Sequence, residues 1–117
     1  MALAVGESFG VPIVGVEEQM RGWLATIAKE RQIDRQVSPY FELERLFAFF
    51  QAFAIVSFDQ KSASLFSESR SAKIRIGAMD LKIASIALAN ESLLLTANKK
   101  DFEKVPGLRF ENWLERS

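Results

Sequence analysis

Residues 79–89 constrain the fold more strongly than any other part of this sequence. Apolar side chains occupy nearly every position of the helix predicted there, among them Leu81, Ile83 and Ile86. A helix that is apolar on all sides must be buried, since each of its faces would otherwise expose hydrocarbon to water. The sequence therefore predicts a central helix that other elements cover, with Asn90 at its C-terminal end.

Short apolar segments elsewhere in the chain are predicted to be strands of one sheet. They lie at residues 11–14, 54–57 and 93–96, with a fourth at 108–110. Predicted strands alternate with predicted helices, which is typical of α/β domains with a parallel sheet. The 117 residues are enough for one hydrophobic core, and they contain no repeat and no linker. We therefore expect a single three-layer α/β domain over residues 1–117.

Three further helices are predicted between these strands. The first follows a turn at Gly15 and runs to about Arg31, with apolar residues on one face. The second is predicted to begin with Ser38 as its N-cap and to bury Phe47 in its apolar stripe. The third is predicted to begin at Asp59, because a short carboxylate side chain suits the N-cap position.

The second of these helices has apolar residues on more than one face. Tyr40, Phe41 and Phe49 lie beside its predicted buried stripe. Two interpretations are open, and the sequence favours neither. The three aromatic side chains belong to a broad core, or they form a surface that a partner chain covers.

The composition narrows the chemistry that the chain can perform. Lysine and arginine number 15, aspartate and glutamate also number 15, and the net charge is zero, so no global basic field attracts nucleic acid. The chain has no cysteine and no histidine, which excludes disulfides, zinc–thiolate sites and a histidine base. Carboxylate and amide oxygens remain, and these suit Mg²⁺ or Mn²⁺. Residues 1–16 resemble neither a signal peptide nor a membrane span, so a cytoplasmic location is expected.

Four polar residues follow predicted strands or open predicted helices. Glu18 lies in the first turn after the strand at 11–14, Asp80 opens the central helix, and Asn98 and Asp101 follow the strand at 93–96. Open parallel sheets bind ligands at the carboxyl ends of their strands. Carboxylates gathered there repel one another unless a cation lies between them. The pattern therefore predicts a divalent metal site that acts on a phosphodiester.

Three motifs and one shorter segment also carry a resemblance to a known family. In chain order they are Val16-Glu17-Glu18-Gln19-x-Arg21-Gly22, Ile76-Gly77-x-Met79-Asp80-Leu81-x-Ile83-Ala84, Leu95-Thr96-x-Asn98-x-x-Asp101-Phe102 and Val105-Pro106-Gly107-Leu108-Arg109-x-Glu111-x-Trp113. At these residues the sequence resembles the PIN domain, specifically the VapC-type toxins of toxin–antitoxin pairs. The three longer motifs cover roughly the last third of the chain, and their order and spacing are specific.

The resemblance implies a function. Members of this family are Mg²⁺-dependent ribonucleases that use a cluster of acidic residues and are silenced by a cognate antitoxin. By position, the catalytic and metal-binding acids correspond to Glu18, Asp80 and Asp101, with Asn98 as a further metal-binding neighbour. The implied cofactor is Mg²⁺ or Mn²⁺, and the implied partners are an RNA substrate, an antitoxin protein and a second copy of the chain in a homodimer. No membrane partner is implied.

The N-terminus departs from the family pattern. The family begins with a central strand that ends in a metal-binding aspartate, whereas here no aspartate precedes Asp34. We expect a PIN-like domain that is N-terminally truncated relative to the family, with its first central strand missing or replaced by residues 1–5. If it is missing, residues 11–14 should pair with residues 93–96, or another chain should fill the gap. The departure leaves an alternative function, a catalytically impaired PIN-like remnant or binding module.

Two groups of charged residues also have simpler explanations. Asp80 could serve only as an acid at a helix N-terminus, where it would stabilise the helix dipole by about 0.3–1 kcal/mol. Lys73, Arg75, Lys99 and Lys100 could line a phosphate track, or they could form an ordinary solvated surface. The sequence leaves both alternatives open.

Overall fold

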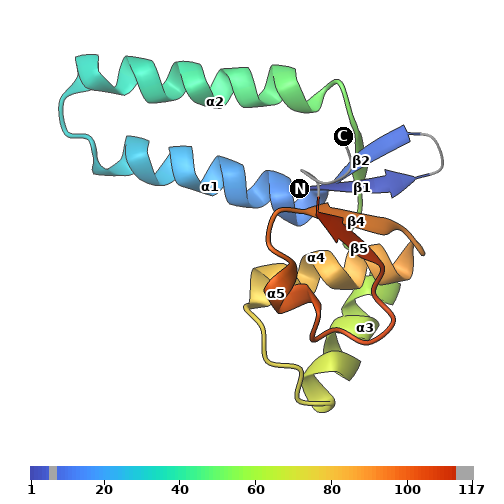
Figure 1. The fold of residues 1–117 in the computed structure, drawn as a ribbon. Helices are drawn as coiled ribbons and strands as arrows, with labels where there is room; N and C mark the ends of the chain where they lie inside the picture. Colours follow the sequence, from blue (N-terminus) through green and yellow to red (C-terminus); the bar gives the residue numbers. More distant parts are fainter. Residues whose placement is uncertain (6–7, 113–117) are drawn as a thin grey trace.

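The computed structural model describes residues 1–5 and 8–112, which form a five-stranded sheet with helices (Figure 1). Trp113, the last residue of the C-terminal motif, lies outside the described residues. The strands are β1 (Ala2–Val5), β2 (Ser8–Pro12), β3 (Ala54–Val56), β4 (Leu93–Thr96) and β5 (Phe110–Asn112). The helices are α1 (Ile13–Lys29), the 3₁₀ turn η1 (Ile33–Gln36), α2 (Val37–Phe50), α3 (Gln60–Ser71), α4 (Ala78–Ala89) and α5 (Lys99–Phe102).

The sheet confirms the α/β class, but its pairing differs from the prediction of a parallel sheet. The strand order is β3-β2-β1-β4-β5. β2 pairs with β3 and β4 pairs with β5 in parallel, whereas β1 is antiparallel to both of its neighbours. The prediction that residues 11–14 pair with residues 93–96 is wrong, because β1 lies between these segments. Two residues separate β1 from β2, and a parallel connection needs a dozen or more, so the pair must be antiparallel.

The junction between β2 and α1 lies three residues earlier than predicted. The strand ends at Pro12, and the helix begins at Ile13, so Gly15 lies inside α1. Pro12 has φ −66° and ψ 138°, the extended conformation of an N-cap residue. Proline cannot donate a hydrogen bond to a sheet, and it therefore suits the end of a strand and the start of a helix.

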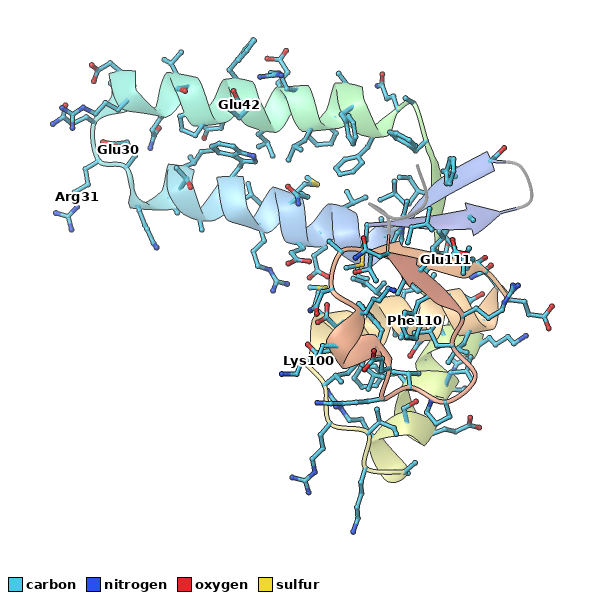
Figure 2. The ribbon with its side chains drawn as sticks, viewed as in Figure 1. Glu30, Arg31, Glu42, Lys100, Phe110 and Glu111 are labelled. Atoms are coloured by element: carbon cyan, nitrogen blue, oxygen red, sulfur yellow. The ribbon has the colours of Figure 1, made fainter. Side chains whose placement is uncertain are left out.

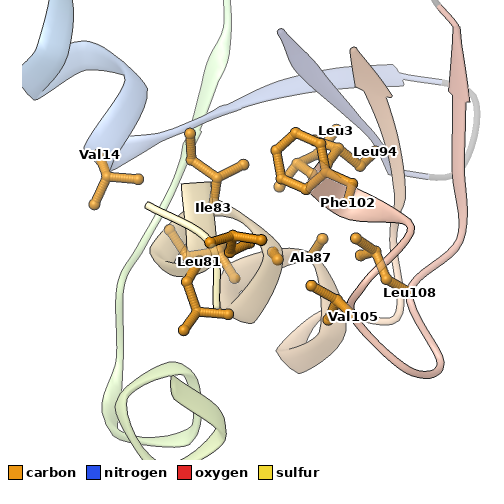
Figure 3. Close-up of a cluster of buried hydrophobic side chains, with 12 residues drawn as sticks. Leu3, Val14, Leu81, Ile83, Ala87, Leu94, Phe102, Val105 and Leu108 are labelled. Atoms are coloured by element: carbon orange, nitrogen blue, oxygen red, sulfur yellow. The ribbon is translucent and has the colours of Figure 1, made fainter. Parts of the chain in front are cut away.

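The prediction of a buried central helix is confirmed by α4. Its residues Leu81, Ile83, Ala84, Ile86 and Ala87 are all fully buried. Figure 3 shows that residues from several elements surround α4. The core residues outside α4 are Leu3, Val14, Ile76, Leu94, Phe102, Val105 and Leu108. These side chains belong to the sheet, to α1, to α5 and to the loops beside α4, so the helix is covered on all sides.

α1 and α2 form an antiparallel hairpin that extends away from the rest of the molecule (Figure 1). α2 begins at Val37 and follows η1 directly, so the prediction of Ser38 as its N-cap is wrong. The Gln36 side chain joins the two helices, because its Nε2 donates to the carbonyl oxygens of Ile27 at 3.2 Å and Glu30 at 2.9 Å. The Gln36 side chain thereby adds hydrogen bonds to carbonyl groups at the end of α1, where helical partners run out.

The environment of α2 overturns one prediction and decides between two others. Phe47 is 55% exposed rather than buried, and Pro39 is the buried residue of this helix. Tyr40, Phe41 and Phe49 are each more than half exposed. The interpretation that these aromatic side chains belong to a broad core is therefore wrong, and they form an apolar surface. Within the described residues, no helix combines the length and the hydrophobicity that a membrane span requires.

The prediction that Asp59 caps the third helix is confirmed. Asp59 is the N-cap of α3, and its Oδ1 accepts hydrogen bonds from the Ser62 amide at 3.0 Å and from the Ser62 hydroxyl at 2.9 Å. These bonds hold the pKa of the Asp59 carboxyl below its usual value. α3 packs against α4 and thereby covers one side of the central helix.

Candidate acidic site

Three predicted site residues lie on three different helices, one of which is the central helix α4. Glu18 belongs to α1, Asp80 lies in the first turn of α4, and Asp101 belongs to α5. The charges of these side chains interact. The pKa of Asp80 is raised above its usual value, first by burial, then by the negative charge of Asp101, and then by that of Glu18. The structure therefore places Asp80 within electrostatic reach of both Asp101 and Glu18.

The start of α4 determines where Asp80 lies. Gly77 is the N-cap residue, and its carbonyl accepts the first helical hydrogen bond from the Leu81 amide at 2.9 Å. No side chain caps this end of the helix. Asp80 is the third helical residue, so its carboxylate lies beside the positive end of the helix dipole. Burial and the charges of Asp101 and Glu18 act in the opposite direction and raise the pKa of Asp80.

Glu18 rather than Glu17 is the acid of α1 that the site can use. The Glu17 carboxylate accepts a hydrogen bond from Arg21 Nη2, one helical turn further along α1. Glu18 is exposed and lines a cavity of about 530 Å³. Apolar residues of β1, β2, α2 and α4 supply most of the other lining residues. The sequence did not predict this cavity, because its walls come from β1, β2, α1, α2 and α4, which lie far apart in the chain.

Asp101 and Asn98 follow the carboxyl end of β4, as predicted. The backbone N–H of Asn98 donates to Thr96 Oγ1 at 3.1 Å, and Asn98 is the N-cap residue of α5. The Asn98 side chain is exposed and makes no capping hydrogen bond. Lys104 Nζ lies 3.9 Å from Asp101 Oδ1, but an exposed pair of this kind contributes little to stability. Asp101 therefore remains available to a cation.

The charged residues at the far end of the α1–α2 hairpin lie away from this site. Figure 2 shows Glu30 and Arg31 at the far end of the hairpin, where α1 leads into α2, whereas Lys100 lies on α5. Lys100 is exposed, and so are Lys73 and Arg75 in the loop before α4. Basic residues that could accompany the acidic site are therefore found in the loops and helices around α4, whereas Arg21 of α1 is paired with Glu17.

The donor atoms at the site suit a hard divalent cation. Three carboxylates and one amide offer the oxygen ligands that Mg²⁺ and Mn²⁺ prefer. Their mutual repulsion, seen in the raised pKa of Asp80, is what a bound cation would relieve. Within residues 1–5 and 8–112, however, no three acidic side chains come close enough to hold a metal ion together. The chemistry of the donors fits a cation, but a closed coordination shell is not formed.

Comparison with known proteins places this fold among toxin–antitoxin structures. No protein-family model matches the sequence. Over 73 residues, 59% of this chain, the sequence is 36% identical to Ribonuclease VapC2 of Rickettsia felis. That match covers 54% of the relative, so the chain spans about half the length of the curated protein that it matches.

Several solved structures that share this fold are VapBC assemblies. The structure of VapBC2 from Rickettsia felis bound to a promoter DNA fragment is matched at a TM-score of 0.62 and 27% identity, over 89% of this chain and 74% of that one. DNA-bound VapBC from Salmonella typhimurium is matched at a TM-score of 0.68 and 22% identity, over 87% of this chain and 73% of that one. VapBC-1 from nontypeable Haemophilus influenzae is matched at a TM-score of 0.67 and 16% identity, over 90% of this chain and 74% of that one. This chain is therefore similar in sequence to Ribonuclease VapC2 over 73 residues, and its fold resembles that of these VapBC structures.

Proposed function

We propose that this chain is a VapC-type PIN-domain endoribonuclease that hydrolyses RNA phosphodiesters with Mg²⁺ or Mn²⁺ and acts as the toxin of a toxin–antitoxin pair. The observation that carries the proposal is the environment of Asp80, which lies partly buried in the first turn of α4 and is repelled by Asp101 of α5 and Glu18 of α1. The similarity to Ribonuclease VapC2 and to VapBC assemblies supports the same function. A cytoplasmic location accords with the proposal.

Asp80 has the central role in this proposal. Its carboxylate is partly buried and carries unfavourable charge in the free protein, so a cation that binds there would relieve both repulsions. Glu18 and Asp101 would complete the negative site, with the Asn98 amide oxygen as a neutral neighbour. When bound, the cation would supply Lewis-acid stabilisation of the phosphodiester and would help to activate water. The side chains themselves would bind and orient the cation and the RNA backbone beside it.

The apolar surface of the α1–α2 hairpin is the proposed partner surface. Phe41 and Phe49 are 57% and 56% exposed, and Leu24 on α1 is 50% exposed. Exposed apolar groups on this scale favour cover by another chain. We propose that a cognate antitoxin covers part of this surface, in line with the VapBC assemblies that share the fold, and that a second copy of the chain covers another part.

A second candidate function is a PIN-like binding module without catalysis. The observation that favours it is the coordination shell, since no three acidic side chains of the described residues lie close enough to hold a metal ion. A site that binds its cation weakly loses affinity and water activation together. Such a protein would keep the partner surface of the hairpin and lose the nuclease reaction.

Metal-dependent cleavage of RNA separates the two functions. The assay compares the wild type, Asp80→Asn and a control, Asp34→Asn, on structured RNA with Mg²⁺, with Mn²⁺ and with a chelator. Asp34 is an exposed acid of η1 in the hairpin connection, so its charge is removed far from the site. We expect the wild type and Asp34→Asn to cleave only with metal, and Asp80→Asn to lose at least about a hundredfold in rate. Cleavage that survives in Asp80→Asn, or its absence in the wild type, would refute the nuclease proposal.

A further inference from the structure

Arg70 connects the end of α3 to the segment that leads into α4. Its Nη1 donates two hydrogen bonds, to the carbonyl oxygens of Ile74 and Ile76, both at 3.0 Å. Its guanidinium carbon lies 5.2 Å from the centroid of the Phe66 ring, a cation–π distance. One nitrogen therefore binds two carbonyl groups of the same segment, while the aromatic ring supports the guanidinium from α3.

The backbone of α3 holds only the first part of this segment. Ile74 donates its amide to the Ser69 carbonyl at 3.0 Å, and Lys73 donates to the Arg70 carbonyl at 3.0 Å. Together with the positive φ of Lys73, 61°, these bonds form a Schellman motif that ends the helix. Beyond Ile74, the hydrogen bond from the Arg70 side chain to Ile76 continues the hold on the chain.

The position of this segment determines the position of Asp80. Ile76 is 8% exposed and packs into the core, and Gly77 after it is the N-cap of α4. The Leu81 amide makes the first hydrogen bond of that helix to Gly77. A displacement of residues 74–77 would therefore displace the first turn of α4, and Asp80 with it, relative to the helices that carry the other two acids.

We propose that Arg70 is a positioning residue, which fixes the first turn of α4 and so the place of Asp80 in the acidic site. The second half of this proposal rests on the proposed function, and the first half does not. Outer-shell groups that orient metal ligands typically change metal affinity by about 10–100-fold when they are removed. A guanidinium that binds two carbonyls from outside the ligand set is a group of this kind.

The test uses the full chain with three substitutions, Arg70→Ala, Arg70→Lys and, as a control, Arg31→Ala. Arg31 is an exposed arginine at the far end of the hairpin (Figure 2). Hydrogen exchange without metal is followed at Leu81, in the first turn of α4, and at Ile86, further along it. We expect Arg70→Ala to accelerate exchange at Leu81 by about tenfold and to leave Ile86 unchanged, since only the first turn loses its support. Equal acceleration at both amides, or none, would overturn the proposal.

The second readout is the affinity for Mn²⁺ alone, measured at a temperature at which every variant is folded. We expect Arg70→Ala to weaken the Mn²⁺ affinity at least about tenfold and Arg31→Ala to leave it within twofold of the wild type. Arg70→Lys should lie between, and millimolar methylguanidinium should restore part of the affinity to Arg70→Ala. A lowered Tm with unchanged Mn²⁺ affinity in Arg70→Ala would show that Arg70 only stabilises the fold. A wild type that binds no Mn²⁺ would refute the proposed function, and the exchange measurement would still decide whether Arg70 positions the first turn.

Discussion

α4 and α2 are both rich in apolar residues, yet they lie in opposite environments. Half of the residues of α4 are buried, and Leu81 and Ile83 are completely inaccessible to solvent. α2 buries Pro39 alone, and the side chains of Phe41 and Phe49 are more than half exposed. The difference follows from their neighbours. The sheet, α3 and α5 enclose α4, whereas α2 packs chiefly on α1 and the two helices extend beyond the sheet (Figure 1).

This difference separates two consequences of hydrophobic composition. Apolar residues around a whole helix require cover, because an uncovered face exposes hydrocarbon to water. The composition does not say what supplies that cover. For α4 the cover comes from this chain, and for the outer face of α2 we propose that it comes from partner chains. The following predictions test the contrast, from the largest expected effect to the smallest.

Truncation of a core residue and of a hairpin residue should have very different costs. We expect Leu81→Ala to lower the free energy of unfolding by about 2–5 kcal/mol, since a fully buried leucine leaves a cavity. Phe41→Ala, at a side chain that is 57% exposed, should change it by no more than about 0.5 kcal/mol. Urea denaturation followed by circular dichroism measures both. A cost for Phe41→Ala near that of Leu81→Ala would mean that the outer face of α2 is already covered in solution.

Backbone substitutions should show that the two regions also differ in strain. Within the described residues, positive φ angles occur at Lys73 (61°), Glu91 (50°) and Gly107 (78°), all in the region around α4. The left-handed conformation favours glycine, so Lys73→Gly should raise the free energy of unfolding by about 1 kcal/mol. Gly107→Ala is the converse control and should lower the free energy of unfolding by about as much, because alanine rarely adopts a positive φ. An added Cβ would meet nothing closer than Leu88 Cδ2 at 4.0 Å, so no clash adds to this cost. A stabilising Gly107→Ala would contradict this account.

Acidity should affect stability through Asp80. Its pKa is raised in the folded protein by burial, by Asp101 and by Glu18, above the ordinary value of 3.8. The folded state therefore binds this proton more tightly, so its contribution to stability is complete below the ordinary pKa and is lost as the pH rises through the folded pKa. At neutral pH, Asp80→Asn should raise the Tm by a few degrees, although the lost helix-dipole interaction offsets about 0.3–1 kcal/mol. Thermal melts should show this gain shrinking toward about pH 4, and a gain that does not depend on pH would contradict it.

The local patterns of the sequence predicted much of the fold correctly. The burial of α4 was predicted from its largely apolar residues, and the N-cap at Asp59 from a short local pattern. Both predictions are confirmed. The central position of β1 was foreseen only as a replacement strand, because pairing depends on contacts between distant segments. The exposure of Phe47 was mispredicted for the same reason, since a helical stripe looks the same in sequence whether or not another layer covers it.

The acidic site was predictable in its members but not in its geometry. Asp80 lies in the first turn of α4, and Asp101 lies in α5, which directly follows β4. Because α4, β4 and α5 are consecutive elements, the approach of these two acids follows from short connections. The approach of Glu18 depends on how α1 lies against α4, which the sequence does not specify. Among the described residues no three acids form a metal-binding group, and local sequence patterns could not predict this because it depends on how the helices pack together.

The effect of Mg²⁺ on thermal stability tests the central claim most directly, because it needs neither the RNA target nor a partner. The claim is that Asp80, Glu18 and Asp101 bring together negative charge that a divalent cation relieves. A cation that binds only the folded state stabilises it, by about 2.7 kcal/mol at one hundred times its dissociation constant. We predict that Mg²⁺ raises the Tm of the wild type and of Asp34→Asn at constant ionic strength and leaves that of Asp80→Asn unchanged. Equal shifts in all three proteins, or none in the wild type, would contradict the account.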